Sequence, residues 1–162
     1  MTAYTTVDSP IGEILLTGEG GALTRLYMSP FHLDSAWEHD PEALAEPIRQ
    51  LAEYFAGERT GFELELAPAG TVFQQRVWAL LLEIPYGETT TYGALARELG
   101  DPRKVRAVGL ANGRNPISIV VPCHRVIGAG GSLVGYGGGL ERKRTLLALE
   151  AEVVAGFRAT LW

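Results

Sequence analysis

The chain has 162 residues, 46% of them hydrophobic, which is typical of a globular protein with one ordinary domain or two small ones. Its formal net charge of −5 argues against nucleic-acid binding if the charge is spread evenly. The sequence contains no membrane-spanning stretch and no signal-peptide pattern at its N-terminus, so we expect no membrane partner and a cytoplasmic location.

The charge is unevenly distributed along the chain. Residues 1–70 carry 12 acidic and 3 basic side chains, whereas residues 71–162 carry 7 acidic and 11 basic ones. Between Arg103 and Arg144, eight basic residues are accompanied by Glu141 alone. Such a stripe is either a solvated basic face or a phosphate-binding surface, and charge alone leaves both interpretations open.

The first half of the chain alternates short apolar runs with turn residues. Strands in an antiparallel meander are predicted at residues 4–7, 14–17 and 23–27. Helical spacing of apolar residues predicts a helix over 41–55, and residues 62–66 are interpreted as a possible strand. The Ala-Pro-Ala-Gly segment at 67–70 is the expected boundary, which gives domains at 1–68 and 71–156.

The second half is predicted to be mostly helical. Thr71 is a candidate N-cap for a helix, and the helix ends before the turn at Pro85. Its expected apolar face consists of Val72, Phe73, Val77, Leu80 and Leu81. A last helix is predicted at about 140–152, with Leu146, Leu147 and Leu149 facing inward.

Two short helices between these elements are predicted to form a helix-turn-helix. One begins at Thr90 or Thr91 and stops at Gly100, and Asp101 followed by Pro102 is a strong start signal for the next, at 102–112. Ala107, Gly109 and Ala111 keep that second helix slim, so its backbone can approach a surface closely, and Arg106 can reach phosphate or the base stack. Many helical hairpins that bind no DNA share this spacing.

The only cysteine, Cys123, stands in the segment Ile-Val-Val-Pro-Cys-His-Arg-Val at 119–126. A thiolate is the reactive form of cysteine, and the neighbouring His124 and Arg125 are groups that favour it. Pro122 is expected to end a strand just before the cysteine, which places it on a loop. The alternative is an inert, packed thiol, since free cysteine is often buried.

A glycine-rich segment and an acidic residue complete the candidate site. Seven glycines lie between Gly128 and Gly139 without the order of a phosphate loop, so we interpret the segment as a mobile wall centred on Tyr136, or else as a floppy hairpin. Glu150, expected near the C-terminal end of the last helix, opposes the helix dipole unless it has a tertiary partner such as His124. Cys123, His124 and Glu150 would then form a nucleophile, base and orienting acid, whereas a surface carboxylate is the plainer alternative.

These residues match an ordered set of motifs. The motifs are Phe73-Gln74-Gln75-Arg76-Val77-Trp78, Ile84-Pro85-Tyr86-Gly87, Thr91-Tyr92-Gly93, Arg106-Ala107-Val108-Gly109, Asn115-Pro116, Val121 to Val126, Gly135-Tyr136 and Gly138-Gly139. In this respect the chain resembles the O6-alkylguanine-DNA alkyltransferases, over most of residues 71–150. The resemblance implies an α+β protein with a ribonuclease-H-like N-terminal domain and a winged-helix-like, mostly helical C-terminal domain.

The resemblance also implies a reaction. Cys123 would accept the alkyl group of a flipped O6-alkylguanine permanently, so that each molecule acts once; O4-alkylthymine is a second implied substrate. His124 would take the thiol proton through a water, with Glu150 holding the imidazole. Asn115 would support a hinge, and Tyr92 would push the target phosphate and assist protonation of the departing base.

The implied partner is double-stranded DNA, bound through its minor groove with little sequence preference. Arg106 would fill the space of the flipped nucleotide. The implied DNA contacts are Arg106, Ala107, Gly109, Ala111 and Arg125. The implied pocket residues are Val126, Tyr136, Gly137, Lys143 and Asn112. The expected state is a monomer, with cooperative binding along DNA left open.

Two departures from the family pattern lead to expectations of their own. Gly137 stands where some members carry serine, so we expect tolerance of adducts larger than methyl. The N-terminal zinc ligands of some relatives are missing, and His32 and His39 lack ligand spacing, so we expect surface histidines, no metal and no cofactor.

Three other functions fit parts of the sequence. The first is a non-catalytic binder of alkylated DNA, although such relatives replace the cysteine. The second is a cysteine hydrolase that uses Cys123 and His124, although adjacent residues on an extended segment point to opposite sides. The third is a transcription regulator that uses the helix-turn-helix alone, which leaves the Pro-Cys-His-Arg segment without a purpose.

Overall fold

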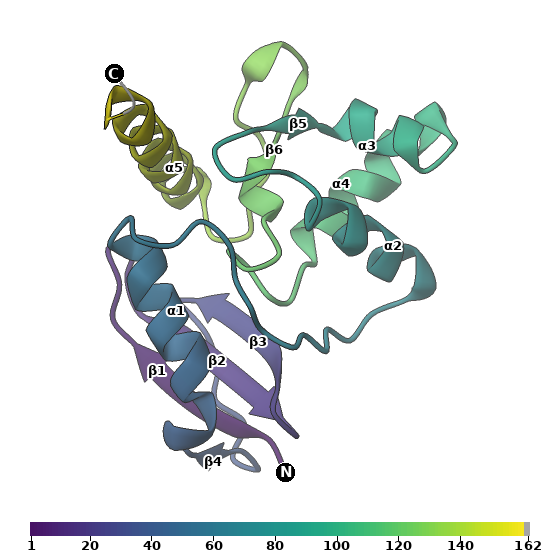
Figure 1. Ribbon diagram of the computed structural model, residues 1–162. Helices are drawn as coiled ribbons and strands as arrows, with labels where there is room; N and C mark the ends of the chain where they lie inside the picture. Colours follow the sequence, from purple (N-terminus) through teal and green to yellow (C-terminus); the bar gives the residue numbers. More distant parts are fainter. Residues whose placement is uncertain (161–162) are drawn as a thin grey trace. The chain divides into compact units, whose positions relative to one another are not determined.

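The computed structural model describes residues 1–160, which form two compact units (Figure 1). Unit 1 comprises Met1–Ala69 together with Pro116–Val120, and unit 2 comprises Gly70–Asn115 and the chain from Val121 onward. The short segment Pro116–Val120, which precedes the cysteine by a few residues, thus belongs to the N-terminal unit. Its Ile117 forms an isolated bridge with Leu26.

The core of unit 1 is a four-stranded sheet. Its strands are β1 (Ala3–Val7), β2 (Ile14–Glu19), β3 (Ala22–Met28) and β4 (Glu38–His39), in the order β3-β2-β1-β4. The predicted antiparallel meander of β1, β2 and β3 is confirmed, whereas the two-residue β4, parallel to β1, had no sequence signal. The central strand β2 is buried on both faces from Ile14 to Leu16.

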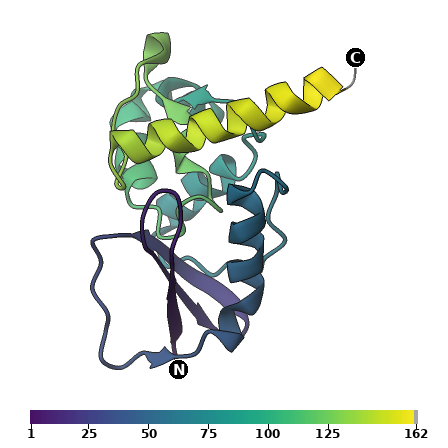
Figure 2. The ribbon, with the colours of Figure 1, turned by 90° about the vertical axis from the view of Figure 1, so that its left-hand side faces the viewer.

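Helix α1 (Ala45–Phe55) covers one face of this sheet (Figures 1 and 2). A 3₁₀ turn, η1 (Glu42–Leu44), precedes it, so the predicted helix over 41–55 is confirmed with a tighter first turn. The side chains of Leu51 and Tyr54 are buried on the sheet side. Burial of the apolar face of α1 against the sheet, rather than helix propensity, therefore stabilises the packing of this helix.

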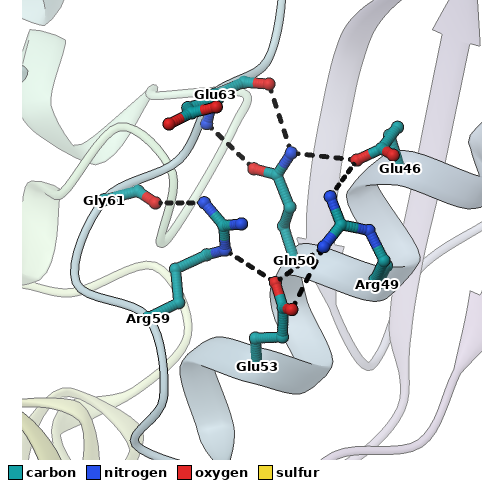
Figure 3. Close-up of polar contacts among 7 residues, drawn as sticks. All are labelled: Glu46, Arg49, Gln50, Glu53, Arg59, Gly61 and Glu63. Carbon is teal, nitrogen blue, oxygen red and sulfur yellow. Dashed lines mark hydrogen bonds and ion pairs between the residues drawn. The ribbon is translucent and has the colours of Figure 1, made fainter.

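The strand predicted at 62–66 is wrong. Both backbone hydrogen-bonding groups of Glu63 are bound by the side-chain amide of Gln50: its Oε1 accepts from the Glu63 N–H at 2.9 Å, and its Nε2 donates to the Glu63 carbonyl at 3.2 Å (Figure 3). Arg59 fastens the same loop through Glu53 and the Gly61 carbonyl. The loop can therefore pair with the sheet only as an isolated bridge between Leu66 and Leu23.

Unit 2 begins with helix α2 (Val72–Leu81), and its predicted cap is confirmed. The Thr71 hydroxyl accepts from the Gln74 N–H, and the Gln74 side chain accepts from the Thr71 N–H, which is a full capping box. The predicted apolar face was wrong at Val72, which is 80% exposed because it shares its face with exposed Gln75 and Arg76. The buried face consists of Val77, Trp78 and Leu81.

The predicted helix-turn-helix is present. Thr91 caps α3 (Tyr92–Glu98) by accepting from the Ala94 N–H at 3.1 Å. Asp101 caps the next element in the same way, but residues Pro102–Lys104 form a 3₁₀ turn, η2, and the α-helix α4 covers Val105–Gly113. Gly100, with a φ of 92°, supplies the left-handed residue that the tight connection needs.

A two-stranded parallel sheet, β5 (Thr90–Thr91) with β6 (Val126–Ile127), links the start of α3 to the segment that follows the cysteine. Two 3₁₀ turns flank β6: η3 (Cys123–Arg125) before it and η4 (Ala129–Gly131) after it. The chain then enters α5 (Leu140–Thr160), which Figure 2 shows as one continuous helix.

Helix α5 is longer than predicted and buries a different stripe. It continues past residue 152 because residues 153–157 carry no proline and only one glycine. Leu146 is buried as predicted, but Leu147 and Leu149 are only half-buried, and the other buried side chains between residues 140 and 157 are Lys143 and Glu150. None of the helices within residues 1–160 is long and apolar enough to cross a lipid bilayer.

Candidate active site

Cys123 opens the 3₁₀ turn η3, and it is 4% exposed. The turn is tight: the Cys123 N–H donates to the Val121 carbonyl at 2.8 Å, and the Arg125 N–H donates to the Pro122 carbonyl at 3.0 Å. The strand expected before Pro122 is absent. Ile119 instead has a φ of 72°, a rare conformation for a β-branched residue, which the surrounding packing must enforce.

Asn115 joins the two ends of the excursion that the chain makes into unit 1. Its side-chain Nδ2 donates to the Val121 carbonyl at 2.7 Å, and the residue is buried. The bond therefore ties Asn115, the last residue before the chain leaves unit 2, to Val121, the first residue after it returns. Val121 lies two residues before Cys123. The hinge role that the family resemblance implies for Asn115 stays a prediction.

The carboxylate of Glu150 is the centre of a buried polar cluster. Its Oε2 lies 2.7 Å from His124 Nε2, and its two oxygens accept from Arg125 Nε at 2.8 Å and Nη2 at 3.0 Å. The Gly87 N–H also donates to it, at 3.2 Å, and Arg125 Nη1 donates to the Ile84 carbonyl at 2.8 Å. The predicted contact of Glu150 with His124 is thus present, and Arg125 makes the site a cluster of three side chains.

Glu150 pairs with His124 as predicted, but its place in helix α5 differs from the prediction. The residue lies in the middle of α5, because that helix continues to Thr160, so the expected conflict with the helix dipole does not arise. What explains a buried acid here is pairing with a bidentate arginine and a histidine.

The cluster fixes the protonation states. Burial raises the pKa of Glu150, but hydrogen bonds from His124 and Arg125 outweigh it and bring the pKa to about 2, so the carboxylate is ionised. Burial lowers the pKa of His124 below its ordinary value of 6.5 by more than Glu150 raises it, so the imidazole is neutral at neutral pH. An ionised carboxylate only accepts, and the proton of neutral His124 therefore lies on Nε2.

The other ring nitrogen of His124, Nδ1, is then an unprotonated acceptor. It is buried and has no hydrogen-bond partner within the described part of the chain. A buried polar atom without a partner is uncommon and is characteristic of catalytic groups or of atoms that bind a water. His124 therefore has the tautomer that a general base needs, on the residue that follows the only cysteine in the sequence.

Arg125 lies elsewhere than the prediction placed it. It was expected at the DNA surface, but the residue is 7% exposed and its guanidinium binds Glu150 and stacks 5.4 Å from the centre of the Tyr86 ring. An arginine that belongs to a basic stripe of the sequence is expected at the surface. The sequence signal for burial is the apolar run Ile119 to Val121 just before it, and the structure buries the whole stretch from Ile119 to Val126.

Lys143 and Val126 meet beside the cysteine turn. The Lys143 ammonium donates to the Val126 carbonyl at 2.6 Å and to the Val134 carbonyl at 2.9 Å, and its residue is fully buried. Burial lowers the pKa of Lys143, while a negative charge on Cys123 raises it. The lysine thus links the backbone after the cysteine to the glycine-rich segment.

Tyr92 and the glycine-rich segment form another part of the same neighbourhood. The Tyr92 hydroxyl donates to the Val134 carbonyl at 3.0 Å. Burial and a charge on Cys123 raise the pKa of Tyr92, against a smaller lowering by a hydrogen bond with the Asn112 side chain. Tyr136 is half-buried and Gly137 is exposed; a Cβ on Gly137 would lie 3.7 Å from the Gly113 carbonyl, an ordinary contact.

The outer surface of α4 and the turn before it is basic. Arg103, Lys104, Arg106 and Arg114 are all exposed. Ala107 and Gly109 are half-exposed on the helix, in line with a close backbone approach.

Ala111, by contrast, is buried. The prediction that its side chain contacts DNA at the surface is therefore wrong. The Ala111 carbonyl accepts from Trp78 Nε1 at 2.8 Å, a bond that anchors α4 to α2. Trp78 was not among the predicted functional or core residues; it is buried together with Val77 and Leu81, and its bond to Ala111 holds α4 against α2.

No cluster of metal-ligating side chains occurs among residues 1–160. His32 and His39 are exposed, as expected for surface histidines.

Residues 72–152 match the family model of the 6-O-methylguanine DNA methyltransferase DNA-binding domain, and residues 2–68 match the ribonuclease-like domain of the same proteins. The methylated-DNA–protein-cysteine methyltransferase of Mycobacterium bovis is 56% identical over 153 residues, 93% of each chain. That of Methanosarcina acetivorans is 51% identical over 91% of this chain and 97% of its own.

Solved structures agree. The Mycobacterium tuberculosis OGT crystallised in complex with DNA superimposes with a TM-score of 0.89 at 56% identity, covering 93% of this chain and 94% of that one. The O6-methylguanine DNA methyltransferase of Methanococcus jannaschii gives a TM-score of 0.68 at 28% identity over 91% of this chain and 93% of its own. The fold class is therefore that of a two-domain α+β protein with a ribonuclease-like N-terminal domain, as predicted. The chain belongs to the methylated-DNA–protein-cysteine methyltransferase family.

The Glu150 cluster yields a prediction on stability. Glu150→Gln leaves the Arg125 guanidinium buried without its counter-ion, which should lower the free energy of unfolding in urea at pH 7 by about 3–5 kcal/mol. Glu152→Gln, an exposed position on the same helix, should change it little.

The pH dependence checks the cause of that loss. The folded pKa of Glu150 is depressed from 4.5 to about 2, so its contribution is complete above pH 4.5 and is lost as the pH falls towards 2. Wild-type stability should therefore fall more steeply over this range than that of Glu150→Gln. Parallel curves would contradict the ionised state of the buried carboxylate.

Proposed function

We propose that this protein repairs DNA by direct reversal, transferring an alkyl group from guanine O6 to Cys123 in a single turnover. The observation that carries the proposal is the neutral, buried His124, held by Glu150 through Nε2 with its Nδ1 free, on the residue that follows the only cysteine in the sequence. Membership of a family whose relatives are named methylated-DNA–protein-cysteine methyltransferases supports the same reaction.

The proposed chemistry is an in-line displacement. His124 takes the proton of Cys123 through a water, and the sulfur attacks the alkyl carbon. The carbon–O6 bond breaks, its electron pair stays on the base, and Tyr92 assists protonation of the departing guanine. The products are a thioether and an unmodified guanine, and no step regenerates the thiol, so each molecule reacts once.

The base pocket is proposed to be lined by residues around the turn. They are Asn112, Val126, Tyr136, Gly137 and Lys143. The Lys143 bonds to the Val126 and Val134 carbonyls support a fixed distance between the turn and the glycine-rich wall. The exposed Gly137, which has no side chain to narrow the pocket, fits the expectation that adducts larger than methyl are tolerated.

Double-stranded DNA is the proposed partner, bound in the minor groove by α4 with little sequence preference and by a monomeric protein. Arg106 fills the place of the flipped nucleotide, while Ala107 and Gly109 allow a close approach. Flipping is required because the O6 substituent inside a duplex cannot reach the sulfur of a cysteine residue that is only 4% exposed. Arg125 holds Glu150 instead of contacting DNA.

Residues 1–68 form the supporting domain in this proposal, and residues 71–156 carry DNA binding and alkyl transfer. O4-alkylthymine is a second proposed substrate. The proposed location is the cytoplasm, where a reducing environment keeps the single thiol available.

Intact mass spectrometry tests the reaction. After mixing with a duplex that contains one O6-methylguanine, the wild-type protein should gain the mass of one methyl group, and Cys123→Ala should gain none. The gain should stop at one equivalent however much DNA is added. Turnover beyond one equivalent, or methylation of the Cys123→Ala variant, would contradict a permanent transfer to this cysteine.

A second experiment tests the role of Arg106. At saturating protein, Arg106→Ala should repair duplex DNA at least about tenfold more slowly, because the extruded state loses the group that fills the base stack. Its reaction with free O6-benzylguanine should be unchanged. Arg103→Ala, which removes a charge of the same sign at an 89% exposed side chain, should weaken binding without slowing the saturated step. An equal loss of rate with duplex DNA and with free O6-benzylguanine would contradict a role of Arg106 in base flipping.

A further inference from the structure

Asn112 is a buried polar residue that uses only one end of its amide. It lies on the inward face of α4 and is 3% exposed. Its Nδ2 donates to the backbone carbonyl of Cys123 at 3.4 Å, whereas its Oδ1 has no hydrogen-bond partner within residues 1–160. The orientation is fixed by chemistry, because a carbonyl only accepts and the NH2 end must therefore face Cys123.

An amide carbonyl buried without a partner destabilises the folded state, and an apolar side chain of the same shape would avoid this cost. Buried unsatisfied groups that persist in folded proteins occur mainly where function requires them. Asn112 is therefore a position at which the fold alone would favour leucine. The reason for the residue should lie in what its NH2 group contacts.

The side chain of Asn112 also lies near the hydroxyl of Tyr92, where its hydrogen-bonding influence lowers the pKa of Tyr92. The two residues belong to neighbouring helices of the helix-turn-helix, where the Tyr92 ring packs 3.9 Å from the position of a Cβ on Gly109. A tyrosine hydroxyl has one proton and two lone pairs, so an N–H on the oxygen leaves the phenol to act as a donor.

We propose that Asn112 is a positioning residue for proton transfer to the departing base: its NH2 group joins the Cys123 carbonyl to the Tyr92 hydroxyl and holds that hydroxyl as a hydrogen-bond donor. In the free protein the phenolic proton points at the Val134 carbonyl of the glycine-rich segment. When the base occupies the pocket, the same proton turns to it. This inference rests on the proposed alkyl transfer and adds to it a residue that acts through Tyr92.

A double-mutant cycle tests the proposal on free O6-benzylguanine, which requires no DNA binding. Asn112→Leu should slow alkylation of Cys123 by about tenfold in the wild-type background, since a misaligned general acid loses part of its effect. In a Tyr92→Phe background the same substitution should slow it by less than about twofold, because its effect passes through the absent hydroxyl. Equal slowing in both backgrounds would overturn the proposal, as would no slowing in the wild type.

Iodoacetamide provides a second readout on the same proteins. The leaving group of iodoacetamide is iodide, which needs no proton. The rate at which iodoacetamide alkylates Cys123 in Asn112→Leu should therefore lie within about twofold of the wild-type rate. A loss as large as with O6-benzylguanine would mean that Asn112 merely supports the cysteine turn, and would overturn the proposal. Failure of the wild-type protein itself to react with O6-benzylguanine would instead contradict the proposed function, on which this inference depends.

Discussion

The buried carboxylate of Glu150 is the interaction on which the active site depends. A charge with no exposed surface is strongly unfavourable unless it is paired, and Arg125, His124 and the Gly87 N–H together occupy both of its oxygens. Burial is the main reason why the pKa of His124 is lowered and the ring stays neutral; it outweighs Glu150, which favours the imidazolium, and the positive charge of Arg125 adds to the lowering. An imidazolium would have no lone pair to accept a thiol proton.

The same cluster fixes the backbone around the cysteine. His124 and Arg125 are consecutive residues of the 3₁₀ turn that Cys123 opens, so binding both of them to one carboxylate on α5 locks the turn. One face of α5 then serves two purposes: Glu150 holds the turn from one side, and Lys143, two turns earlier, holds the carbonyl of Val126. Asn115 and Asn112 add bonds to the carbonyls of Val121 and Cys123. Reactive groups placed with such accuracy need rigid support of this kind.

Local signals in the sequence predicted the local structure well. Thr71, Thr91 and Asp101 each cap the helix or 3₁₀ turn that follows, because a cap depends only on residues within one turn. The errors arose where a distant side chain decides the outcome. Gln50 occupies the backbone of Glu63 and prevents a strand, and Trp78 draws the carbonyl of Ala111 into the core. Arg125 turned inward because of Glu150, which lies 25 residues away in the chain. For the site itself, the motif around Cys123 identified the residues, whereas only the fold reveals which ring nitrogen of His124 is available.

The central claim is that His124 is neutral, with its proton on Nε2 and an unprotonated Nδ1. Nitrogen-15 NMR of the imidazole measures this directly, in a protein in which the other two histidines, His32 and His39, have been replaced. At pH 7 the account predicts a neutral ring whose Nε2 carries the proton and whose Nδ1 has the shift of an unprotonated nitrogen. An imidazolium with both nitrogens protonated, or the opposite tautomer, would contradict it.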